Sequence, residues 1–235
     1  MGFRIAPSFI CFDLLKLEEQ FEVMRSFGIR NLHLDVMDGN FVEQITIGSD
    51  FIGQLHRAYD DIFLDTHLMV MNPISKIKTF AEAGSNCITF HIEAVKNIDE
   101  ACEICSAIRS FGIQCGVAIN PETNIGVIGE ILKYVELNRV LIMSVKPGLS
   151  GQKFIDSSVE KIKKLRTILM KFGLENKTEI WVDGGINFDT LYHVIGVGIT
   201  GVVIGSALHR LKDESNDRIM NFRKNIEGFM KLVNK

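Results

Sequence analysis

The residues best suited to chemistry in this sequence are a histidine and an aspartate near the end of a short apolar run, His33 and Asp35. Because the side chains of a β-strand alternate between its two faces, both residues point to the same face of a strand predicted over 30–35. The turn signal Asp38-Gly39 places them near the carboxyl end of that strand, where a ligand can reach them. Taken alone, the two could also be a hydrogen-bonded pair inside a protein core.

Two further residues of the same types, His67 and Asp183, stand at the ends of other β-rich runs. Two imidazoles with two carboxylates suit a divalent ion such as Zn, Mn, Fe or Co, whereas an all-oxygen site would favour Mg or Ca. If the two aspartates approach one substrate from opposite sides, each can exchange a proton on its own face. A metal between them would stabilise the oxyanion formed when a C–H beside a carbonyl ionises, so the set predicts inversion of a stereocentre. We expect solvent to reach His67, because it stands at a strand end.

A recurring boundary divides the chain into similar units: a helical pattern ends in a small or aromatic residue and glycine, and a β-rich run follows. The glycines are Gly28, Gly84, Gly112, Gly173 and Gly198. Glycine at this position can adopt the positive φ that ends a helix without a Cβ penalty. The spacings are multiples of roughly 28 residues, so about eight strand-helix units fill the chain. This predicts an α/β fold with one domain, a (βα)8 TIM barrel over residues 1–235.

The individual elements agree with that count. The predicted strands lie near residues 4–9, 30–35, 62–69, 86–91, 113–119, 139–145, 179–183 and 201–204. The predicted helices lie near residues 14–27, 50–58, 74–82, 97–110, 124–135, 156–171, 188–196 and 216–233. Active sites of such barrels are built from the carboxyl ends of the strands and the loops after them, so we expect the functional residues there.

Glycines gather at three of those strand ends and predict a phosphate site. With one serine, the set is Gly148, Gly151, Gly184, Gly185, Gly205 and Ser206. Backbone N–H groups and a short helix N-terminus in these loops can collect an anion without a lysine or arginine clamp. Turns also need glycine, so the recurrence at neighbouring strand ends is what favours an anion site.

Composition limits the kind of partner. The chain has 235 residues, 46% hydrophobic and 23% charged, as in an ordinary soluble globular protein. A formal net charge of −3 argues against nucleic acid as a partner and favours a small molecule. No apolar run is long enough to span a membrane, and the odd set of five cysteines suits a reducing compartment, so we expect a cytoplasmic protein. The spacing of Cys102 and Cys105 indicates helix packing, because no second cysteine pair lies near.

At the level of motifs, nearly the whole chain resembles the ribulose-phosphate 3-epimerases, a family that includes the allulose-6-phosphate 3-epimerase branch. The matching segments are Ala6-Pro7-Ser8-Phe9, residues 33–39, Thr46-Ile47-Gly48, residues 65–70, residues 90–94, residues 120–123, residues 143–145, Pro147-Gly148, residues 151–155, residues 182–187 and Gly205-Ser206-Ala207. The resemblance implies a TIM barrel of the ribulose-phosphate-binding type. It also implies an isomerase of carbohydrate metabolism, acting in the pentose phosphate pathway.

The same resemblance assigns roles to individual residues. It implies that His33, Asp35, His67 and Asp183 bind one divalent metal ion, with zinc ahead of manganese, iron or cobalt. It implies that Asp35 and Asp183 are the acid/base pair that inverts C3 of a ketose phosphate, D-ribulose 5-phosphate to D-xylulose 5-phosphate, through an enediolate. Ser8, Met37, Met69 and Met143 are expected to line the substrate site, although methionines also fill gaps in cores. We expect a homo-oligomer.

Three departures from the family pattern keep other functions open. Glu43-Gln44 replaces Pro-Asn, Ile92 replaces proline between His91 and Glu93, and Lys146 replaces Asn or Asp. We include Lys146 among the substrate-binding residues. A lysine at a strand end could also form the Schiff base of an aldolase, which would leave the metal-site residues unexplained. The first loop looks more like the allulose-6-phosphate branch, and a paralogue that binds sugar phosphate without turnover is a third alternative.

Overall fold

A computed structural model of the chain describes residues 2–209 and 217–233. The strands are β1 (Arg4–Pro7), β2 (Asn31–Met37), β3 (Phe63–Met69), β4 (Cys87–His91), β5 (Gln114–Ile119), β6 (Arg139–Met143), β7 (Glu179–Asp183) and β8 (Gly201–Ile204). The α-helices are α1 (Leu17–Ser26), α2 (Ser49–Ala58), α3 (Ile77–Glu82), α4 (Ile98–Ser110), α5 (Gly126–Ile131), α6 (Ser157–Lys171), α7 (Leu191–Ile195) and α8 (Arg218–Val233). Helices therefore alternate with strands along the described chain, as predicted.

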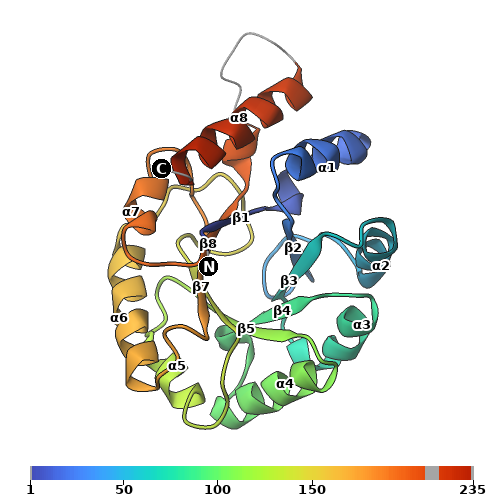
Figure 1. The fold of residues 1–235 in the computed structure, drawn as a ribbon. Helices are drawn as coiled ribbons and strands as arrows, with labels where there is room; N and C mark the ends of the chain where they lie inside the picture. Colours follow the sequence, from blue (N-terminus) through green and yellow to red (C-terminus); the bar gives the residue numbers. More distant parts are fainter. Residues whose placement is uncertain (1, 210–216, 234–235) are drawn as a thin grey trace.

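The strands form one parallel sheet that curves into a barrel, and the helices surround it (Figure 1). In the sheet, each of the strands β2 to β7 pairs with the strand that follows it in sequence, and β8 pairs with β1. At the seam between β1 and β2, a single parallel bridge joins Ser8 to His33. The predicted (βα)8 barrel is confirmed.

Several element ends differ from the prediction because side chains and tight turns replace helix or strand pairing. The first strand stops at Pro7, before a 3₁₀ turn at Phe9–Cys11, while β2 continues to Met37. The predicted helix 188–196 starts only at Leu191, because the Asn187 side chain accepts hydrogen bonds from the next turn's N–H groups. The start of the predicted helix 216–233 lies outside the described residues.

Two apolar cores result from the alternation of strand side chains. The larger one lies between the sheet and the helices, and it takes the outward residues of the strands, such as Leu32 and Leu34. The smaller one fills the barrel itself and consists of Ala6, Ala118, Leu141, Met143, Trp181 and Val203. The barrel is therefore a packed core, and a ligand can enter only at one of its ends.

The glycines at the helix ends behave as predicted. Gly28, Gly84, Gly112, Gly173 and Gly198 have φ values of 75, 103, 74, 67 and 76°.

Cys102 and Cys105 both lie in α4 and are free thiols, in agreement with a packing role. Among the described residues, no helix has the length and apolar character that crossing a membrane requires.

We predict that Gly28→Ala lowers the free energy of unfolding by about 1 kcal/mol, because an L-residue is strained at this positive φ. An added Cβ at Gly28 would meet no atom within 4 Å, so strain alone sets the cost. Gly196→Ala is the matched control, since Gly196 has a φ of −70° and equally open space. Urea unfolding should place this control within about 0.5 kcal/mol of wild type. Equal losses in both variants would contradict the assignment of strain to φ.

Candidate active site

The four residues predicted to bind a metal come together at one end of the barrel. His33 and Asp35 extend from β2, His67 from β3 and Asp183 from the end of β7. The parallel register of β2 with β3 places Asp35 directly beside His67. One donor atom from each residue lies within 4.8 Å of the other three. The structure therefore confirms that these residues form one cluster.

The donor separations fit a single small cation. The His33 Nε2 atom lies 3.2 Å from His67 Nδ1 and 3.3 Å from Asp35 Oδ1, and His67 Nδ1 lies 3.0 Å from that same oxygen. Asp183 Oδ2 is more distant, at 3.9 Å from His33 Nε2 and 4.0 Å from His67 Nδ1. Ligands placed about 2.1 Å from one tetrahedral ion would be about 3.4 Å apart. This cluster of two nitrogens and two oxygens could hold a divalent metal ion.

Burial differs across the cluster. Both histidines are 0% exposed, whereas the side chains of Asp35 and Asp183 are 6% and 17% exposed. The expectation that solvent reaches His67 is wrong, because β4 and the loop after β2 cover it: the ring of His91 lies against His67, and the ring of Phe41 lies against His91. Access to the cluster is therefore from the carboxylate side.

Ser8 contacts the cluster from the seam between β1 and β2. Its hydroxyl donates to Asp35 Oδ2 at 2.7 Å, so one oxygen of that carboxylate faces the cluster and the other faces Ser8. Ser8 is 4% exposed and is held by its backbone N–H, which donates to Ile204 O at 2.9 Å. Its position lets it orient Asp35 as well as line the cavity.

The two carboxyl groups have opposite proton affinities in the metal-free protein. Burial and the negative charge of Asp35 raise the pKa of Asp183 to about 7. Burial opposes ionisation of Asp35 too, but His33 and His67 outweigh it and hold the pKa of Asp35 far below its usual range. Burial likewise works against a charge on His33, yet Asp35 and Asp65 raise its pKa well above the usual value. The site therefore holds one ionised and one readily protonated carboxyl group, as general acid/base chemistry requires.

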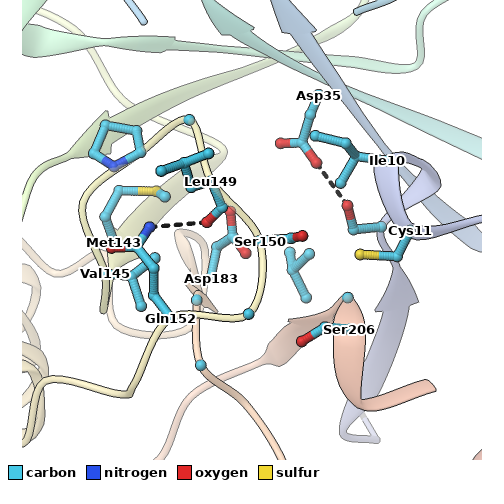
Figure 2. Close-up of a pocket in the computed structure, with 18 of the residues that line it drawn as sticks. Ile10, Cys11, Asp35, Met143, Val145, Leu149, Ser150, Gln152, Asp183 and Ser206 are labelled. Carbon is cyan, nitrogen blue, oxygen red and sulfur yellow. Dashed lines mark hydrogen bonds between the residues drawn. The ribbon is translucent and has the colours of Figure 1, made fainter. Parts of the chain in front are cut away.

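A pocket opens over the two aspartates, and all predicted substrate and phosphate residues line it. These residues are Ser8, Met37, Met69, Met143, Lys146, Gly148, Gly151, Gly184, Gly185, Gly205 and Ser206. In Figure 2 the side chains of Asp35 and Asp183 turn toward the centre of this pocket, with Cys11 and Ser206 at one side and Met143 at the other. His33 and His67 lie behind the aspartates and do not line it.

Glycine is required where the loops after β6 and β7 meet. An added Cβ at Gly185 would lie 2.5 Å from the backbone nitrogen of Phe154 and 2.7 Å from its Cα. The backbone of Gly185 also has a φ of 65°. The expected short helix after β8 is a single 3₁₀ turn, Ser206–Leu208. The anion site predicted from the glycines thus consists of loop backbone that lines the pocket, with little helix behind it.

Sequence reasoning missed several residues of the site. Gln152 donates to the backbone oxygens of Lys146 and Leu149 at 2.6 and 2.8 Å, which holds the loop after β6 in its fold. Cys11 lines the pocket, and burial together with the charge of Asp35 raises its thiol pKa to about 12, so it is neutral. No spacing in the sequence indicates either role, because both depend on loop conformation.

Asp65 is a further missed residue, although a signal for it exists. Its Oδ2 accepts from His33 Nδ1 at 2.8 Å, and the same oxygen lies 2.6 Å from Arg139 Nη1. Asp65 stands two residues before His67 in β3, so strand alternation predicts that it faces the barrel interior as His67 does. A carboxylate there supports a histidine ligand from behind.

Comparison with known proteins agrees with this geometry. A sequence profile of the ribulose-phosphate 3 epimerase family matches residues 4–209. The chain belongs to this family. Its relatives include the ribulose-phosphate 3-epimerases of Chlamydia muridarum, 39% identical over 79% of both chains, and of Aquifex aeolicus, 37% identical over 89% of this chain and 90% of that one. The Bacillus subtilis ribulose-phosphate 3-epimerase is 36% identical over 89% of this chain and 94% of its own.

Solved structures agree on the fold of this epimerase-family chain. Phosphoribosyl anthranilate isomerase from Thermus thermophilus superposes with a TM-score of 0.64 over 97% of this chain and all of its own, at 14% identity. KGPDC from Streptococcus mutans gives a TM-score of 0.68 over 99% of both chains, also at 14% identity. Identities this low show the barrel alone. The curated relatives named above do not favour the allulose-6-phosphate branch.

We predict that metal binding to this site releases protons and strengthens as pH rises through about 7. The pKa of Asp183 is raised to about 7 and that of His33 lies well above its usual value, so both are protonated below neutrality in the metal-free protein. His33 must lose its proton before Nε2 can bind the ion, and a proton on Asp183 weakens that carboxyl group as a ligand. Calorimetric titration with Zn²⁺ at about pH 6, in buffers of different ionisation enthalpy, measures this release. An affinity that stays flat between about pH 6 and about pH 8 would contradict the prediction.

Proposed function

We propose that this protein is a metal-dependent epimerase that interconverts D-ribulose 5-phosphate and D-xylulose 5-phosphate by inverting C3. The observation that carries the proposal is the pair of carboxyl groups with opposite proton affinities, both turned into one pocket beside a cluster that could hold a metal. The relatives named ribulose-phosphate 3-epimerase support the choice of substrate. A homo-oligomeric state and a cytoplasmic location stay predictions.

His33, Asp35, His67 and Asp183 would hold the metal, and their mixed nitrogen and oxygen donors favour Zn²⁺, with Mn, Fe or Co as alternatives. When bound, the ion supplies positive charge next to the oxygens of the substrate. Asp35 and Asp183 then act on the proton at C3. The ionised carboxylate takes it from one face while the electron pair moves into the C2 carbonyl, and the protonated carboxyl returns a proton to the other face.

The remaining lining residues support this chemistry. Met37, Met69 and Met143 are buried at 2–5% exposure and give the pocket an apolar, polarisable wall. Such a wall excludes water from the enediolate that forms between the two proton transfers. We propose that the backbone N–H groups around Gly148, Gly151, Gly184, Gly185, Gly205 and Ser206 bind the phosphate, because these residues line one side of the pocket.

We predict that Asp35→Asn and Asp183→Asn each abolish epimerisation in both directions, with a loss on the order of 10³-fold or more. Each aspartate is the base for one epimer and the acid for the other. In deuterated water, a variant that still binds metal can retain C3 exchange from one epimer only. NMR of the ketose phosphate follows exchange and epimer formation in the same tube.

The same assay separates the alternatives. Near-wild-type turnover by either metal-loaded aspartate variant would contradict the two-base assignment. Binding of both ketose phosphates by the wild-type protein without any C3 exchange would instead identify a paralogue that lacks turnover. Faster exchange with allulose 6-phosphate than with ribulose 5-phosphate would identify allulose 6-phosphate as the preferred substrate.

Lys146 is the departure from the family pattern that lies closest to the reaction. It is exposed, lines the pocket and also borders a neighbouring cavity of about 750 Å³ that Glu43 helps to form. Among the described residues, no hydrogen bond or ion pair engages its Nζ atom. It could therefore reach a substrate hydroxyl or phosphate, but it stands outside the cluster that handles the proton.

We predict that Lys146→Asn changes KM, or the preference between five- and six-carbon ketose phosphates, and leaves kcat within about tenfold. The reason is that a cation at the rim contributes equally to ground-state and transition-state binding. Steady-state kinetics with both substrates measures it. Complete loss of kcat, together with trapping of an imine by borohydride in the wild type, would favour the Schiff-base aldolase.

A further inference from the structure

We propose that His91 and Glu93 are positioning residues that fix the tautomer and orientation of His67, so that its Nδ1 lone pair faces the metal site. The proposal rests on the metal-binding role proposed for His67. Neither residue touches the pocket above the aspartates. They act from the side of His67 that points away from the cluster.

The contacts form a continuous chain behind His67. His67 Nε2 lies 2.9 Å from His91 Nε2, and His91 Nδ1 lies 3.0 Å from Glu93 Oε2. The centroids of the two imidazole rings are 4.9 Å apart and their planes differ by 27°, so the rings meet edge to edge, and both side chains are fully buried. Water therefore cannot replace either imidazole as a hydrogen-bond donor or acceptor.

Only one order of donors and acceptors is possible along the hydrogen bonds from His67 through His91 to Glu93. An ionised carboxylate can only accept, so His91 must donate its Nδ1–H to Glu93. In neutral His91, Nε2 is then the acceptor, and it receives the Nε2–H of His67. The remaining nitrogen of His67, Nδ1, is left with a lone pair that points at the cluster. A carboxylate at the far end of the chain thus determines which nitrogen of His67 binds the metal.

His33 is oriented in the same way as His67, but by one residue instead of two. Its Nδ1–H donates directly to Asp65, which leaves Nε2 to face His67 Nδ1 across 3.2 Å. Two nitrogen lone pairs and the Asp35 Oδ1 atom then converge with no hydrogen between them, an arrangement that a cation stabilises.

Glu93 is itself fixed, so the chain has a rigid end. Its Oε1 atom accepts from the backbone N–H of Asn120 at 2.8 Å. The loop that begins at Asn120 is held by Lys161 of α6, whose Nζ donates to the backbone oxygens of Asn120, Pro121 and Thr123 at 2.6, 2.6 and 2.7 Å. Both oxygens of Glu93 are therefore required as acceptors.

Substitutions at Glu93 and His91 test the donor order. In Glu93→Gln the amide offers one acceptor where two are needed, so either its NH₂ group faces the Asn120 N–H or His91 must change tautomer. His91→Leu removes the acceptor for His67, whereas His91→Gln can still accept from His67 and donate to Glu93. We expect Glu93→Gln and His91→Leu to weaken Zn²⁺ binding by roughly 10- to 100-fold, and His91→Gln to stay within about threefold of wild type.

The dissociation constant is measured by competition with a chromophoric chelator on metal-stripped protein, for variants whose metal-free circular dichroism spectrum matches wild type. Glu130→Gln is the matched control, because that exposed carboxylate on α5 pairs with Lys133 at the surface. Long-range ¹H–¹⁵N spectra of the zinc-loaded protein should show His67 protonated at Nε2 in the wild type and in His91→Gln. In Glu93→Gln this single tautomer should be lost.

The outcomes separate this proposal from the proposed function. Zinc affinities of Glu93→Gln and His91→Leu within threefold of the Glu130→Gln control would overturn the positioning role. Equal losses in His91→Leu and His91→Gln would also overturn it, because packing alone would then explain the effect. If Asp183→Asn leaves the zinc affinity at the wild-type value, the metal site itself is refuted, whichever result the His91 and Glu93 variants give. If His91→Leu fails to fold, Glu93→Gln decides the question.

Discussion

The parallel register between β2 and β3 is the constraint on which the site depends. It pairs His33 with Asp65 and Asp35 with His67, so a single ladder positions three of the four cluster residues together with Asp65. A slip by one residue would turn all of these side chains to the other face of the sheet, among the apolar residues that meet the helices. The alternation of Leu32 and Leu34 with His33 and Asp35 makes that slip unfavourable, because it would place the polar side chains among the apolar residues that meet the helices, away from their hydrogen-bond partners.

Charge balance extends this constraint to the opposite end of the barrel. The ion pairs alternate in sign from Asp65 to Arg139, from Arg139 to Glu179 at 3.1 Å, and from Glu179 to Arg4. The Arg139 guanidinium also lies 4.4 Å from the centre of the Trp181 ring. Burying charges is costly unless each one is paired, and removal of one partner leaves the other unpaired in an apolar interior. The network thus allows a carboxylate to support His33 in the middle of a packed core.

Much of the fold and the cluster could be predicted from the sequence because the signals are local. Glycine at helix ends marks the repeated unit, and alternation in strands places His33 with Asp35. The start of α7 after Asn187 and the depth of His67 were not predictable in this way, since they depend on a side-chain turn and on the rings of His91 and Phe41 that cover His67. The link from His67 to His91 joins two strands, and no pattern within either strand indicates which ring nitrogen meets which.

The seam between β1 and β2 has a consequence for how the barrel opens. Ser8 joins the two edges: its backbone N–H donates to Ile204 of β8, it forms the bridge to His33, and its hydroxyl donates to Asp35. Elsewhere around the barrel, whole ladders of backbone hydrogen bonds connect the strands. The first strand is therefore attached to β2 through the bridge to His33 and the Asp35 carboxylate. A ligand bound at Asp35 therefore also stabilises the contact between β1 and β2. Its binding should slow amide hydrogen exchange along both strands, because the barrel must open at this seam for exchange to occur.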